Sequence, residues 1–165
     1  MVLSFLTFIH VTISLAGIVA GLVVLRGLLV GQRLDRWTAL FLSTTVLTSV
    51  TGFFFPTTHL LPSQIVGGVS LLILTLAIYA RYSRRLQGAW RKVYVIGAVI
   101  ALYLNVFVGV VQAFLKISSL RALAPTQSEP PFKLTQLIVL LLFIALGAIA
   151  TMRFSDKAIH RTSLA

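Results

Sequence analysis

The chain has 165 residues, of which 58% are hydrophobic and 10% charged, and its mean hydropathy is +1.02. Soluble domains carry about 25% charged residues, so this composition excludes a soluble globular domain and predicts an α-helical membrane protein. The net charge is +11, but the basic residues lie between apolar blocks rather than in a basic domain, which argues against nucleic acid as a partner. The lack of cysteine excludes disulfides and thiolate chemistry.

The first apolar block covers residues 3–25 and precedes the first basic residue, Arg26. A signal peptide would begin with basic residues, so we expect an uncleaved span. One face of this helix carries small and polar residues, namely Thr7, His10, Ser14, Gly17 and Gly21. The two glycines, four residues apart, predict the close approach of a neighbouring helix.

The second and third predicted spans cover residues 38–55 and 64–80. The second is rich in hydroxyl side chains, and Thr48 and Thr51 share one of its faces. Hydroxyl groups in a membrane helix bond to the helix carbonyls or to a neighbouring helix, so their presence is compatible with a span.

The fourth predicted span, residues 94–115, is the one around which we expect the others to pack. Its small and polar residues recur at steps of three or four, at Tyr94, Ala98, Ala101, Asn105, Gly109, Gln112 and, just beyond it, Lys116. We expect this face to point into the bundle, and Leu104, Val106 and Val110 to face lipid or apolar neighbours. If Gly109 lies at a close helix contact, its replacement by leucine should destabilise the fold by about a few kcal/mol.

The fifth predicted span covers residues 134–152 and follows the longest loop, which contains Pro125, Pro130 and Pro131. We therefore predict one membrane domain, residues 1–165, folded as an all-α polytopic transmembrane bundle of about five spans. The first loop, the third loop and the tail hold eleven of the fourteen Lys and Arg residues. Positive residues favour the cytoplasmic side, so the N-terminus is predicted outside and the C-terminus inside.

Two stretches carry a resemblance: YLNVFVGVVQAFLK in the fourth span and LAPTQSEPPF in the following loop. They resemble small bacterial multi-span integral membrane proteins that have no established activity. The resemblance implies the inner (plasma) membrane of a bacterium as the location, and it implies no site residue.

The strongest polar groups within the spans gather in the outer half of the predicted bundle. At 1.5 Å per residue, His10 lies about 10 Å below the outer surface, and the candidate ligand-binding residues at or below that surface are His10, Thr48, Thr51, Asn105 and Gln112. Two interpretations stay open. The residues form a pocket that orients a polar head such as a quinone carbonyl, or they form hydrogen bonds that hold the helices together.

Cofactor and enzyme chemistry find little support in the sequence. A bis-His haem needs two histidines at matched depth, but His59 lies in a loop and His160 in the tail on the other side. The only acidic residues, Asp35, Glu129 and Asp156, lie outside the spans, so neither a paired-carboxylate site nor a metal site is predicted. We expect no cofactor, no metal and no catalytic residue, with haem as the least favoured alternative.

The predicted partners are the lipid bilayer and, through Arg81, Arg84 and Arg85, anionic lipid headgroups. The first functional hypothesis is a non-enzymatic membrane protein that acts through helix, lipid or partner contacts, as a subunit of a membrane complex for instance. The alternative is a protein that binds a small molecule or a quinone in the outer-half pocket.

Overall fold

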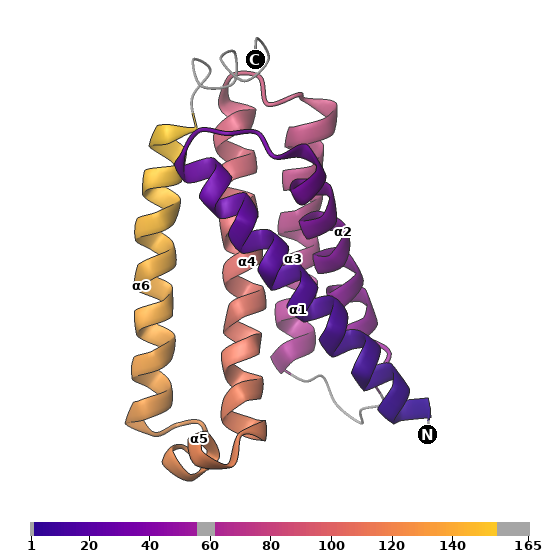
Figure 1. Ribbon diagram of the computed structural model, residues 1–165, viewed down its shortest axis with the longest axis vertical. Coiled ribbons are helices and arrows are strands. Elements are labelled where there is room, and N and C mark those ends of the chain that lie inside the picture. Colours follow the sequence, from indigo (N-terminus) through magenta and orange to yellow (C-terminus); the bar gives the residue numbers. More distant parts are fainter. Residues whose placement is uncertain (1, 56–61, 155–165) are drawn as a thin grey trace.

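The computed structural model describes residues 2–55 and 62–154, and the regular structure in these ranges is helical throughout (Figure 1). The elements are α1 (Val2–Leu29), α2 (Asp35–Gly52), α3 (Pro62–Ile78), the π-helical turn η1 (Tyr79–Ser83), α4 (Ala89–Lys116), α5 (Ser118–Leu123) and α6 (Pro130–Arg153). The predicted all-α class is confirmed for the part of the chain that is described.

Four helical segments are long and apolar enough to span a membrane: Ser4–Leu29, Ser63–Ser83, Ala89–Lys116 and Pro130–Arg153. They match four of the five predicted spans. The remaining one, residues 38–55, falls on α2, which begins with the charged pair Asp35 and Arg36 and carries many hydroxyl groups. This helix is more polar than the four candidate spans. It packs along α1, with which it makes its most extensive contacts.

Helix α4 is the centre of the bundle, because it contacts each of the other helices. The predicted inward face is buried over its first half: Tyr94 and Ala101 are fully buried, and Ala98 and Asn105 are 2% and 8% exposed. The periodicity of the sequence thus identified the face of α4 that forms the core.

Two helices approach α1 closely at Gly21. A Cβ atom on this residue would stand 2.5 Å from Leu102 Cδ1 and 2.9 Å from the ring of Phe41, which confirms the close approach predicted from the glycine spacing. Gly109 differs from the expectation. A Cβ atom there would meet only Ile18 Cδ1, at an ordinary 3.6 Å, so Gly109 does not lie at a tight helix contact.

The two ends of the bundle differ in charge. The turns that join α1 to α2 and η1 to α4 lie at one end, together with the end of α6, whereas the N-terminus and α5 lie at the other (Figure 1). The first of these ends carries the two loops that are rich in arginine. The basic segments are therefore gathered at one end, as the predicted topology requires.

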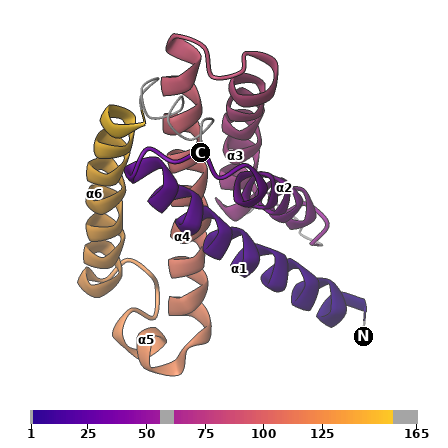
Figure 2. The ribbon, with the colours of Figure 1, turned by 45° about the horizontal axis from the view of Figure 1, so that its top comes forward.

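The two ends also differ in packing. Helix α1 crosses α4 obliquely and diverges from it toward the N-terminus (Figure 2). No residue from 4 to 16 is buried, whereas Gly17, Ala20, Gly21 and Val24 are. On α4 the buried residues are concentrated before Asn105, and only Phe114 is buried after it. The core thus occupies the half next to the basic loops, and the other half is less tightly packed.

Candidate functional site

A cavity of about 540 Å³ lies in the less tightly packed half, between α1, α2, α3 and α4. Apolar side chains from these helices form part of its wall. Its polar lining consists of Thr7, His10, Ser14, Thr48, Ser49, Ser63, Gln64, Ser70, Asn105, Gln112 and Lys116. Sites for small molecules commonly measure about 300–1,000 Å³ and combine apolar walls with a few polar groups, so the size and composition of this cavity fit such a site.

The structure brings the predicted ligand-binding residues together. His10, Thr48, Asn105 and Gln112 line the cavity, and Thr51 is joined to it by a hydrogen bond with His10. These residues come from three helices that are separated by dozens of residues in the chain. Whether they bind a ligand stays a prediction, but their grouping at one place is a property of the fold.

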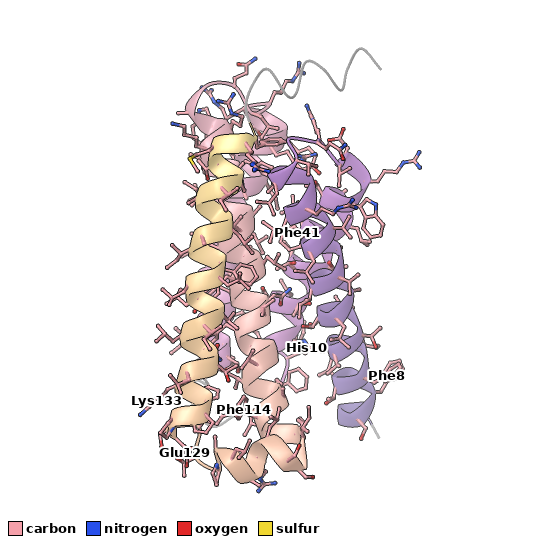
Figure 3. The ribbon with its side chains drawn as sticks, turned by 60° about the vertical axis from the view of Figure 1, so that its left-hand side comes forward. Phe8, His10, Phe41, Phe114, Glu129 and Lys133 are labelled. Carbon is pink, nitrogen blue, oxygen red and sulfur yellow. The ribbon has the colours of Figure 1, made fainter. Side chains whose placement is uncertain are left out.

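His10 lies on α1, in the same half of the bundle as Lys133 and Glu129 and away from Phe41 (Figure 3). Its Nδ1 atom lies 2.8 Å from Thr51 Oγ1, and its ring meets the ring of Phe55 edge-on at 5.2 Å between centroids. His10 thus forms a hydrogen bond from α1 to α2, which is the kind of contact between helices that the second interpretation of these residues expects.

Thr48 is set apart from the other threonines of α2. The hydroxyl groups of Thr44, Thr45 and Thr51 each donate to the carbonyl four residues earlier, at 2.7 Å. Thr48 is 9% exposed, and its buried Oγ1 has no hydrogen-bond partner among the described residues. A buried hydroxyl without a partner costs about 1–3 kcal/mol, so Thr48 is an energetically costly residue in the cavity wall.

Asn105 closes the deep end of the cavity, where the packed core begins. Its Nδ2 atom is 3.5 Å from Thr45 Oγ1, which is a long hydrogen bond. Gln112 and Lys116 are exposed and stand about two and three turns further along α4. Among the described lining residues, Lys116 carries the only formal charge and none is acidic. The lining thus runs from an amide at depth to a cation at the rim.

Two features of the lining were missed or misplaced from the sequence. Leu104 was expected to face lipid or apolar neighbours, but it lines the cavity; here α4 exposes a wider face because α1 has diverged from it. The contribution of α3 was not foreseen. Its signal was the spacing of Gln64, Gly67 and Ser70, which places all three on one side of a helix.

A second polar cluster lies at the opposite, arginine-rich end. Arg81 is 2% exposed, donates to Asp35 Oδ1, and lies over the ring of Tyr94 at 5.0 Å from its centroid. The hydroxyl group of Tyr94 is in turn 3.4 Å from Thr38 Oγ1. These contacts tie α2, η1 and α4 together with a buried cation.

The position of Arg81 does not fit the predicted contact with lipid headgroups, because its guanidinium is buried and paired inside the protein. Arg84 and Arg85 are exposed, and Arg84 lies 5.3 Å from the centroid of the Trp90 ring. Headgroup binding therefore stays a prediction for Arg84 and Arg85.

The described residues contain no group of three or more His, Cys, Asp or Glu side chains placed to hold a metal ion. His59, Asp156 and His160, which were considered above for haem and metals, lie outside the described residues. No protein-family model, curated protein or solved structure matches this chain.

Proposed function

We propose that this chain is a multi-span membrane protein that binds a small amphipathic molecule in the cavity between α1, α2, α3 and α4. One observation carries the proposal: a cavity of about 540 Å³, with apolar walls and eleven polar lining residues, in a chain that is otherwise strongly apolar. Polar groups inside a membrane bundle are costly and mark sites of function. This favours the small-molecule hypothesis over a role limited to helix or partner contacts.

We further propose that the protein acts by binding rather than by catalysis, in the inner membrane of a bacterium. The described lining has no acidic residue to pair with His10, which supports a binding role. The arginine-rich end would face the cytoplasm, so that the cavity lies in the outer half of the membrane. Exposed Arg84 and Arg85 would then meet anionic headgroups at the inner surface.

The proposal can be tested by filling the cavity. Gly109 lines it, and a Cβ atom on this residue would have only Ile18 Cδ1 nearby, at 3.6 Å, so the ring in Gly109→Phe would project into the empty volume. Gly68 provides the matched control, because nothing lies within 4 Å of a Cβ atom there and the residue does not line the cavity.

The assay measures saturable binding of 4-octylphenol and decylubiquinone to the full chain in nanodiscs, corrected for partition into empty nanodiscs. We expect the wild type and Gly68→Phe to bind at least one of these probes and Gly109→Phe to lose that binding. Equal binding by all three proteins, or no saturable binding by the wild type, would show that the cavity is not the site.

A further inference from the structure

The hydrogen-bond pattern around His10 assigns the position of its proton. Thr51 has one hydroxyl hydrogen, which it donates to the carbonyl oxygen of Leu47 at 2.7 Å. Toward His10 the same oxygen must therefore accept, and the hydrogen between them belongs to Nδ1. In the neutral imidazole the other nitrogen, Nε2, then carries a lone pair and can only accept a hydrogen bond.

This nitrogen has no hydrogen bond to any of the described residues. His10 is partly exposed and belongs to the cavity wall. An acceptor without a donor at the wall of a largely apolar cavity selects for a guest that can supply a hydrogen.

Thr48 belongs to the same wall, but its hydroxyl oxygen is buried. Thr48 and Thr51 are three residues apart on α2, and side chains at that spacing are neighbours on the helix surface, with about 5–6 Å between their Cβ atoms. Thr51 holds His10, whereas Thr48 Oγ1 is covered by protein and does not face the cavity. The group that a guest can reach here is therefore the acceptor on His10.

We propose that the cavity binds amphipathic molecules whose head is a hydroxyl group, such as a phenol, a quinol or a long-chain alcohol. The head donates its hydrogen to His10 Nε2, while its apolar part lies against the aliphatic walls. This inference rests on the proposed function and narrows it, because a head that has only a carbonyl oxygen, such as a quinone, cannot satisfy Nε2.

The chief competing guest is an anionic amphiphile that pairs with Lys116 at the rim. Lys116 is exposed, and an exposed ion pair contributes little to binding. His10 is more buried than Lys116, so that leaving its acceptor unpaired costs more. The geometry therefore points to the hydroxyl head rather than to a carboxylate.

The test compares two probes that differ by one hydrogen-bond donor: 4-octylphenol and its methyl ether, 4-octylanisole. Binding to the full chain in nanodiscs is corrected for partition of each probe into empty nanodiscs. We expect the phenol to bind about tenfold or more tightly than the ether, which is the effect of leaving the acceptor unsatisfied once a guest covers it. Decanoate serves as the anionic probe and is expected to bind more weakly than the phenol.

Two variants connect this preference to His10. His10→Phe removes the acceptor and should reduce the ratio of the two affinities to near one, whereas His10→Gln retains an acceptor and should keep part of it. Thr48→Val removes a buried hydroxyl that the guest does not reach, so phenol binding should stay unchanged, and the thermal stability of the empty protein should stay the same or rise.

Thr75→Val is the matched control, since Thr75 is exposed on α3, donates to the Leu71 carbonyl and does not line the cavity. It should leave phenol binding unchanged. Equal affinities for phenol and ether in the wild type, or tighter binding of decanoate, would overturn the hydroxyl inference and leave the cavity as a binding site. No saturable binding of any probe would overturn both.

Discussion

The crossing of α1 and α4 at Gly21 gives a sharp prediction when Gly21→Ala is compared with Gly109→Ala. The new methyl group at residue 21 would stand 2.5 Å from Leu102 Cδ1 and 2.9 Å from the Phe41 ring. Both neighbours are 1% exposed, so neither can move without displacing others. The new methyl group at residue 109 meets only Ile18 Cδ1 at 3.6 Å.

Both substitutions replace glycine by alanine within a helix, so the gain in helix propensity, about 1 kcal/mol, is similar and cancels in the comparison. What remains is the overpacking at residue 21, which typically costs about 1–3 kcal/mol. We therefore expect Gly21→Ala to be less stable than Gly109→Ala by about 1–3 kcal/mol.

The free energy of unfolding would be measured by titrating the protein with SDS in mixed micelles and following the helical circular dichroism signal. Equal stability of the two variants, or a more stable Gly21→Ala, would show that α1 and α4 do not cross at Gly21. The cavity would then lose its shape as described too, because it depends on the same placement of α1.

Three further predictions concern the ends of the bundle. Asp35→Asn leaves buried Arg81 without its carboxylate partner and should destabilise the protein by about 1–3 kcal/mol, a value that allows for the solvent exposure of Asp35. Arg33→Gln removes only an exposed partner of Asp35 and should cost at most about 1 kcal/mol. Equal losses of stability in the two variants would contradict the role of Arg81. Desolvation acts to raise the pKa of Glu129, but hydrogen bonds from the Thr126 hydroxyl and from backbone N–H groups of the same loop outweigh it and hold that pKa below its usual value. The stability that ionised Glu129 contributes is therefore complete above the usual pKa of a glutamate and is lost as the pH falls through the lowered pKa of Glu129. Unfolding titrations from pH 6 to about pH 3 should show this loss of stability in the wild type and a smaller loss in Glu129→Gln. Identical pH profiles of the two proteins would refute the contribution of Glu129. A green fluorescent protein fused after Ala165 should fluoresce in bacterial cells, and a periplasmic alkaline phosphatase at the same place should be inactive; the reverse result would invert the topology.

The sequence predicted the face of α4 well because a helix repeats every 3.6 residues. Tyr94, Ala98, Ala101 and Asn105 share that face in any straight helix, and their small or polar side chains distinguish it from the lipid-facing sides. The rise per residue likewise placed His10 and Thr51 at matching depths, which is why their contact could be expected before the fold was known.

Periodicity does not state how far two helices diverge, and this explains the misplacement of Leu104. One half of α4 packs tightly against its neighbours through a narrow face, and the other half borders the cavity through a wider face that includes Leu104. Periodicity also does not reveal contacts between residues that are remote in sequence. Asp35 and Arg81 are 46 residues apart, and each alone reads as an ordinary charge in a loop next to a membrane.

Because α1 crosses α4 tightly at Gly21 and diverges from it toward the N-terminus, a small rotation of α1 about Gly21 moves the N-terminal half of α1 by a larger distance. Residue 10 lies eleven positions from this pivot, which at 1.5 Å per residue is about 16 Å, so a change in tilt of about 5° displaces it by about 1.4 Å. Membrane helices change their tilt when the thickness of the bilayer changes. The width of the cavity, and with it the affinity for any guest, should therefore vary with acyl-chain length, which would let the surrounding lipid regulate the protein without contacting the site.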